Sequence, residues 1–142
     1  MIGIGPAASA AMMQGLQSLL DNDAAAGTCE LYKGTRVATA GAAADAAELL
    51  STIYLAKPCG SVPTSGINAG ALVLSTSPDA QLLRDGAPTW ARFRAGDSSF
   101  AFDCDARLTG AADTGQEVVI AAAALLAGAF VRLTNASKFT AE

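Results

Sequence analysis

The clearest pattern in the sequence is a pair of runs with alternating side chains, Thr89–Ala95 and Phe100–Asp105. The residues between them, Gly96 to Ser99, combine a glycine with short polar side chains, which favour a turn. Because the side chains of a strand alternate between its two faces, this pattern predicts a β-hairpin. In the second run the alternation puts Phe100, Phe102 and Cys104 on one face.

The hairpin also holds much of the aromatic content of the chain. It contains the only tryptophan, Trp90, and three of the five phenylalanines, Phe93, Phe100 and Phe102. Aromatic side chains bury large apolar areas, so we expect the hairpin to supply a large part of an aromatic core.

Near the N-terminus, apolar residues recur at helical spacing between Ser9 and Leu20, and Asp21 to Asp23 end the run. This predicts an amphipathic helix of about three turns with Ser9 as its N-cap. A helix this short is marginal in water by itself, so it docks either on its own domain or on a neighbouring subunit. If a partner covers it, the contact residues are Met12, Leu16, Leu19 and Leu20.

Several further segments show strand patterns bounded by turn residues. They are Thr28–Lys33, Glu48–Ala56, Ala71–Ser75, Glu117–Ile120 and Ala129–Thr134. Glu48–Ala56 is apolar on both faces, which predicts a central position in a sheet. We expect a turn at Ser77–Asp79 that opens one helical turn, whereas the run 121–127 is compatible with either helix or extended chain.

About seven short strands separated by turns, without alternating long helices, predict an all-β domain. The expected architecture is an antiparallel β-sandwich or jelly roll with an N-terminal amphipathic helix. We divide the chain into an N-terminal arm and helix (1–27), a β-sandwich domain (28–134) and a polar C-terminal tail (135–142), which Phe139 would have to anchor.

The composition also shows that the chain has few charged residues for a surface exposed to solvent. The 142 residues fit one domain, and only 15% of them are charged. This favours burial of part of the surface in an assembly. The net charge of −4 opposes binding to nucleic acid. The apolar N-terminus has no Lys or Arg before Lys33, and no long apolar run follows, so we expect a soluble protein that is neither exported nor bound to a membrane.

The sequence offers little catalytic chemistry. It contains no histidine, which excludes Ser-His-Asp and HExxH sites. The three cysteines, Cys29, Cys59 and Cys104, have no paired spacing and are expected to be buried, reduced thiols, although one pair could form a disulfide after release into an oxidising environment. We therefore expect a protein that is not an enzyme and needs no cofactor.

Two candidate sites are weighed against simpler interpretations. Asp97, Asp103 and Asp105 cluster around the hairpin and could hold a hard cation or act as an acid and base pair, but their spacing matches no calcium loop. Trp90 could form a sugar-stacking platform with Tyr32 and Tyr54, although a lone tryptophan near phenylalanines is more often part of a core.

Three short motifs resemble a family of small virion proteins of tailed phages. They are Leu31-Tyr32-Lys33-Gly34-Thr35-Arg36, Thr89-Trp90-Ala91-Arg92 and Phe102-Asp103. The resemblance covers roughly Thr28 to Leu133. This chain has Val37 where the family tends to have proline, and Cys104 where it tends to have glycine.

The resemblance implies a capsid cement protein of the jelly-roll type, which binds the outside of an HK97-like shell. Its partner would be the major capsid protein, it would act as a homodimer, and it would lie on the outer capsid surface of the virion. The alternative is a tail or fibre accessory protein that binds a host carbohydrate and exposes Trp90 and Tyr54.

Overall fold

The computed structural model describes residues 3–141, so residues 1 and 2 of the predicted arm and residue 142 of the predicted tail lie outside it. The helices are α1 (Pro6–Asp21) and the short 3₁₀ helix η1 (Ala46–Glu48). The strands are β1 (Thr28–Tyr32), β2 (Leu49–Tyr54), β3 (Gly60–Ser61), β4 (Leu72–Leu74), β5 (Ala80–Gln81), β6 (Trp90–Arg94), β7 (Phe100–Leu108), β8 (Val118–Ala122), β9 (Phe130–Leu133) and β10 (Lys138–Phe139).

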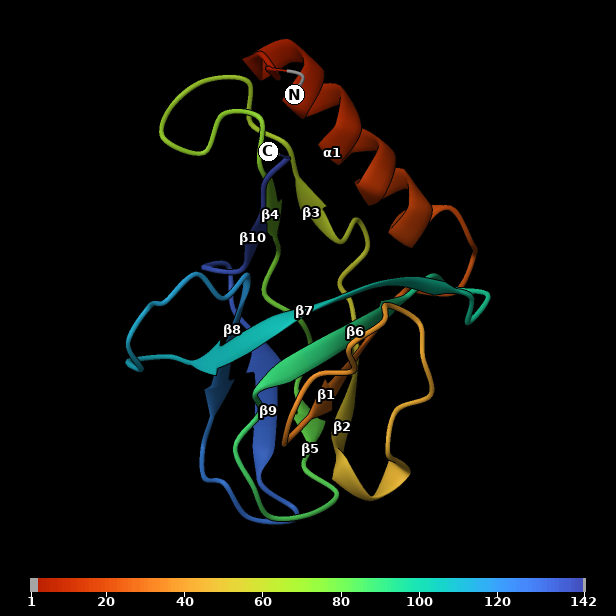
Figure 1. The fold of residues 1–142 in the computed structure, drawn as a ribbon, viewed down its shortest axis with the longest axis vertical. Helices are drawn as coiled ribbons and strands as arrows, with labels where there is room; N and C mark the ends of the chain where they lie inside the picture. Colours follow the sequence, from red (N-terminus) through yellow and green to blue (C-terminus); the bar gives the residue numbers. More distant parts are fainter. Residues whose placement is uncertain (1–2, 142) are drawn as a thin grey trace.

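The body of the molecule is a nearly closed, barrel-like sheet (Figure 1). Within residues 3–141 its seven strands follow the order β2-β1-β6-β7-β8-β9-β5. The two ends approach each other, because the Ser51 hydroxyl donates to the Gln81 carbonyl at 2.9 Å and the Leu83 N–H donates to the Leu50 carbonyl at 2.7 Å. The prediction of an all-β body with an N-terminal helix is confirmed.

The expectation of purely antiparallel pairing is wrong at one place. Strands β7 and β8 run parallel where Ala106–Leu108 lie beside Val118–Ile120. The reason is the loop 109–117, which carries the chain back along β7 before β8 begins. Every other strand pair within the described range is antiparallel.

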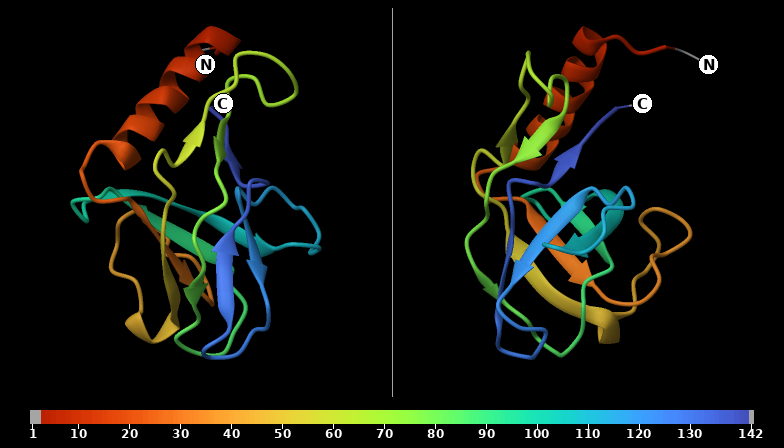
Figure 2. Two further views of the ribbon diagram at one scale, coloured as in Figure 1. Left: turned by 180° about the vertical axis from the view of Figure 1, so that it is seen from behind. Right: turned by 90° about the vertical axis from the view of Figure 1, so that its left-hand side faces the viewer.

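Helix α1 packs with a second, small sheet at one end of the molecule (Figure 2). That sheet has the order β10-β4-β3. The Ser9 hydroxyl donates to the Gly70 carbonyl at 3.0 Å, and the Gln17 amide donates to the Gly60 carbonyl at 2.7 Å. The helix thus docks on its own domain. Ser9 is not its N-cap, because the helix starts earlier, at Pro6, whose fixed φ suits a first turn.

The predicted hairpin is confirmed as β6 and β7, but one side chain lies on the unexpected face. Phe93 pairs with Phe102 and Arg94 pairs with Phe100, so Ala101 is an extra residue that forms a β-bulge. The bulge reverses the alternation beyond it. Phe100 therefore lies on the outer face, 5.4 Å from the guanidinium of Arg92, instead of beside Phe102.

The aromatic core joins the hairpin to the C-terminal tail. The rings of Phe93 and Phe102 stack at 4.7 Å, and Phe139 meets them edge-on at 5.5 and 5.0 Å. Phe139 is buried, and its strand pairs with β4. The boundary predicted at residue 134 therefore does not separate the tail from the body.

Three local predictions need correction. Strand β2 lies at one end of the sheet order and not at its centre, although its residues Leu50 and Ser51 bond to the chain around β5. Residues 80–81 form a strand where a helical turn was expected, because Ala80 and Gln81 pair with β9. The ambiguous run 121–127 begins as the end of β8 and continues as turns.

Truncation of Phe139 tests how far the tail supports the core. We expect Phe139→Ala to lower the free energy of unfolding by about 3–5 kcal/mol, since it removes a buried ring and leaves a cavity. Phe130→Ala is the control, because that ring is mostly exposed, and should cost less than about 1 kcal/mol. Urea denaturation measures both. If Phe139→Ala lowers the free energy of unfolding no more than the expected small loss for Phe130→Ala, the tail does not stabilise the core.

Candidate functional site

The three aspartates around the hairpin do not form a common site. Asp103 is ion-paired with Arg92, and Asp105 with Arg36 at 3.3 Å. Asp97 caps its own turn, where the Ser99 hydroxyl and N–H donate to it and lower its pKa. Within residues 3–141 no group of three or more potential metal ligands comes together.

The pair Arg92–Asp103 is instead a buried structural element. The Arg92 Nε and Nη2 atoms donate to the two Asp103 carboxylate oxygens at 2.8 and 3.0 Å, and both side chains are only 4% exposed. Segment 33–45 covers them, because Arg92 also donates to the Ala42 carbonyl at 2.8 Å and the Gly41 N–H donates to Asp103 at 3.2 Å. The hydrogen bonds with Asp103 raise the pKa of Arg92.

The sugar-stacking platform suggested by the sequence is wrong for Trp90. Its indole ring stacks on Tyr32 at 4.4 Å and is only 1% exposed, while Tyr54 is 64% exposed. The indole N–H has no hydrogen-bond partner within the described part of the chain. A ligand that reaches Tyr54 therefore does not reach Trp90.

The four helix residues predicted to contact a partner divide between two faces of α1. Met12 is 53% exposed, and Leu19, seven residues further along the same face, is 43% exposed. Leu16 is half-buried. Leu20 is fully buried in the core of its own chain, so its assignment to a partner contact is wrong. The sequence analysis missed Met13, which is buried on the inner face with Leu16 and Leu20.

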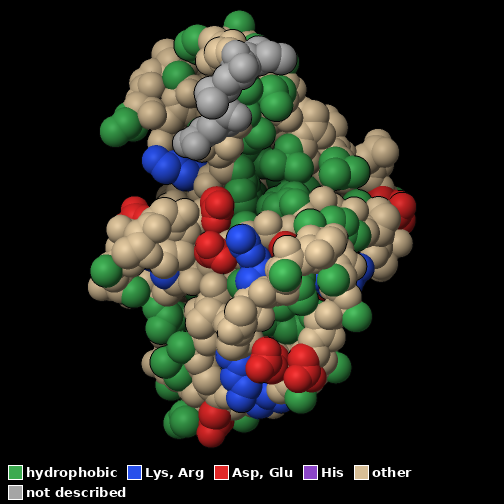
Figure 3. Space-filling model, in the orientation of Figure 1, with side chains coloured by type: hydrophobic (Ala, Val, Ile, Leu, Met, Phe, Trp, Pro, Cys, Tyr) green, Lys and Arg blue, Asp and Glu red, His purple; other side chains and the backbone are tan. Residues whose placement is uncertain are grey.

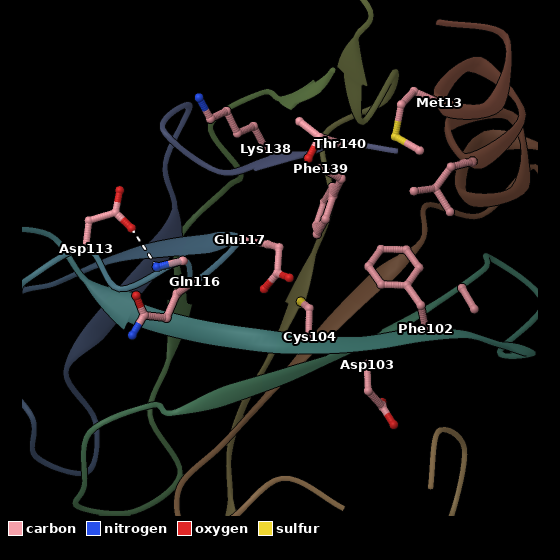
Figure 4. A pocket seen from close by; sticks show the side chains of 13 residues that line it. Met13, Phe102, Asp103, Cys104, Asp113, Gln116, Glu117, Lys138, Phe139 and Thr140 are labelled. Carbon is pink, nitrogen blue, oxygen red and sulfur yellow. Dashed lines mark hydrogen bonds between the residues drawn. The ribbon is translucent and has the colours of Figure 1, made fainter. Parts of the chain in front are cut away.

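An open groove runs between this inner face of α1 and the body, and we take it as the candidate binding site. Its volume is about 700 Å³. Met13, Leu16, Phe102 and Phe139 form its apolar floor, and Figure 4 shows Met13, Phe102 and Phe139 directed toward one another. In Figure 3 the hydrophobic side chains gather in the hollow beneath the helix.

One wall of the groove is a strand edge. Strand β7 pairs with β6 along Phe100–Asp105 but meets β8 only from Ala106 onward. Between Phe100 and Asp105 its second edge has no strand partner within residues 3–141. The Asp105 N–H on that edge donates to a side chain instead, the Glu117 carboxylate, at 3.1 Å.

The groove holds charged groups but no activated nucleophile. Asp113 pairs with Arg107 at 3.7 Å, whereas Glu117 and Lys138 form no ion pair within the described residues. Cys104 also lines the groove, and burial raises its pKa well above the usual thiol value. The arrangement suits binding through backbone and apolar contacts.

The sequence carried no local signal for this site. The residues by which β7 extends beyond its pairing with β6, Ala106–Leu108, pair with β8, so the length of the strand does not point to the open edge at residues 101–104. The helix side chains that complete the floor come from more than 80 positions away, as Met13 and Phe102 show, and no local pattern connects them.

The comparisons with known proteins do not identify a family. No protein-family model, curated protein or solved structure matches the chain. Among the described residues, no helix has the length and apolar character needed to span a bilayer.

Neutralising Asp103 tests the buried ion pair. We expect Asp103→Asn to lower the free energy of unfolding by about 3–5 kcal/mol, because Arg92 is left buried without a counter-charge. Asp105→Asn is the matched control two residues away. Its exposed pair with Arg36 should be worth about 0–1 kcal/mol. Thermal and urea unfolding measure both variants, and equal effects would contradict the structural role of Asp103.

The cysteines provide a test through pH. Burial raises the pKa of Cys59 to about 12 and those of Cys29 and Cys104 also rise, from an ordinary value of 9.0. The folded state thus favours the neutral thiols, so their contribution to the free energy of unfolding should be fully present below pH 9.0 and be lost as the pH rises above it.

At pH 8 an aromatic disulfide reagent should label no thiol of the native protein and all three after denaturation. Fast labelling of the native protein would contradict this burial.

Proposed function

We propose that this protein is a non-enzymatic capsid cement protein that binds the outer surface of a phage shell and joins neighbouring copies of the major capsid protein. The motif resemblance and the low content of charged residues support this proposal. It includes the finer assignment of the barrel-like body to the jelly-roll cement type and the action of the protein as a homodimer.

The observation that carries the proposal is the exposure of apolar side chains at two opposite ends of the molecule. We name these the helix end, at the top of Figure 1, and the loop end, at its bottom. The helix end carries the exposed side chains of Met12 and Leu19, from α1, and of Ile67, from the connection between β3 and β4. The loop end consists of Leu83, Leu125, Leu126 and Phe130, from the β5–β6 and β8–β9 connections and the start of β9.

Two separate apolar ends suit a protein that bridges two neighbours. Exposed apolar side chains gathered at one end of a molecule favour burial of that end against another protein. A protein that binds the assembled shell and not its dissociated subunits stabilises the shell by its binding free energy. When many copies bind, even small contacts at each end add to a large effect on the particle.

The alternative of a carbohydrate-binding tail module has lost its main physical support. It required Trp90 and Tyr54 to be exposed together, and Trp90 is buried against Tyr32. Tyr54 alone remains available for stacking.

Paired charge substitutions at the two ends test the cement proposal. The variants are Met12→Glu with Leu19→Glu at the helix end, and Leu126→Glu with Phe130→Glu at the loop end. Each pair should weaken binding to purified expanded capsids at least about tenfold, because a carboxylate is then buried in an apolar contact. Co-sedimentation measures binding, and heating of the capsids measures the stabilisation.

The matched control is Gln14→Glu with Ser18→Glu, which adds the same charge to exposed positions on another face of α1. It should bind and stabilise as the wild type does. The cement proposal fails if the wild-type protein does not bind capsids, or if capsids that lack it resist heat as well as complete ones.

A further inference from the structure

We infer that the groove between α1 and β7 binds a short extended peptide segment of a partner protein, which adds as a strand to the free edge of β7. The segment would have alternating apolar side chains and one basic residue near Glu117. This inference goes beyond the cement proposal and does not depend on it, because it concerns a different surface from the two exposed ends.

The position of the bound peptide segment, which we call the guest strand, follows from the arrangement of the sheet. Strand β8 occupies the edge of β7 only from Ala106 onward, because its chain arrives there from the loop 109–117. The same strand position along the edge of β7 is open beside residues 101–104, which line the groove. At about 3.3 Å per residue, this stretch pairs with about four residues of extended chain. The bulge at Ala101 marks the N-terminal limit of this open stretch of β7.

The backbone of this edge is available for pairing. The Ala106 N–H donates to the Thr89 carbonyl on the β6 side, whereas the Asp105 N–H donates to Glu117 on the groove side. Because neighbouring residues of a strand point their N–H groups to opposite edges, the N–H of Asp103 also faces the groove. An added strand would bond to the backbone groups of Asp103, since the Asp105 N–H is already bonded to Glu117.

The surroundings select the side chains of the guest. Residues on its inner side would meet the apolar floor, formed by Met13, Leu16, Phe102 and Phe139. Residues on its outer side would lie beside Asp103, whose charge Arg92 already neutralises, and would stay near solvent. The groove therefore selects an alternation of apolar and polar residues.

Charge then favours a basic residue in the guest. Glu117 lies at the edge of β7 and has no cationic partner within the described residues. Figure 4 shows the ammonium group of Lys138 directed away from the carboxylate of Glu117. A lysine or arginine of the guest that reaches Glu117 would form a charge-assisted hydrogen bond in a partly covered site.

The shape of the groove favours a flexible segment over a second folded copy. Helix α1 forms one side and the loop residues 113–117 and strand β10 form others, so the edge of β7 lies in a hollow (Figures 3 and 4). An extended chain can enter this hollow, whereas the edge strand of another intact barrel would meet α1 first. The inferred occupant is thus an extended peptide segment of a different protein, with one basic residue that reaches Glu117.

A displayed library of random hexapeptides, selected on the immobilised full chain, tests the inference. We expect enriched peptides with alternating apolar residues and a lysine or arginine. The strongest one is then synthesised, together with a copy whose alternate backbone amides are N-methylated, which should bind at least about tenfold less tightly because strand pairing is blocked. Binding should also slow amide exchange at Asp103.

Variants locate the binding surface. Glu117→Gln keeps the acceptor for the Asp105 N–H and removes the charge, so it should weaken binding about threefold to tenfold without loss of fold. Leu16→Lys should abolish binding, whereas Leu19→Lys, on the exposed face of the same helix, should not. Circular dichroism confirms that each variant is folded.

Several results would overturn the inference. It fails if no peptide is enriched, if the enriched peptides lack the alternation, or if they bind Leu16→Lys and Leu19→Lys equally. Self-association that Leu16→Lys removes would show that a second copy occupies the groove, and would also overturn it. None of these results affects the capsid assay, which depends on the two exposed ends.

Discussion

The bidentate ion pair between Arg92 and Asp103 is the interaction on which the central hairpin depends. It lies under segment 33–45, with the aromatic rings of Trp90 and Phe100 close to the guanidinium. Burying two charges is costly, and the cost is offset only when their hydrogen bonds are made, as they are here. The pair therefore holds a glycine- and alanine-rich segment against the sheet, although Val37 is its only apolar side chain larger than that of alanine.

The opposite face of the same hairpin is apolar, so its two strands are covered on both sides. Phe93 and Phe102 pack inward against Phe139, which ties the C-terminal strand to the hairpin. This double coverage fixes β7 firmly while part of its edge stays unpaired. An edge held in this way can accept another strand without rearrangement, which lowers the entropic cost of binding.

The molecule thus combines a rigid body with surfaces that its own chain leaves uncovered. The exposed apolar side chains occur toward opposite ends of the molecule, and the groove beneath α1 lies on the inner face of that helix (Figure 1). A body of low charge with several such surfaces suits a protein that functions within an assembly. The cement proposal uses the two ends, and the peptide groove adds a third, directional contact.

The sequence by itself determined the elements whose signals are local. The alternation in Thr89–Asp105 identified the hairpin, and the spacing of apolar residues identified the helix, because both periods are properties of a few neighbouring residues. The burial of Trp90 and Phe93 also followed from their residue types. The three cysteines were correctly expected to be buried thiols.

Tertiary structure alone decided what depends on residues distant in the chain. The bulge at Ala101, which turns Phe100 outward, arises from the register in which β7 pairs with β6. The parallel pairing of β8 with β7 arises from the path of the loop between them. Which side of α1 faces its own domain depends on docking against β3 and β4, so Leu20 became core while Met12 stayed exposed. The groove exists only where these long-range arrangements meet, and for that reason no local pattern could reveal it.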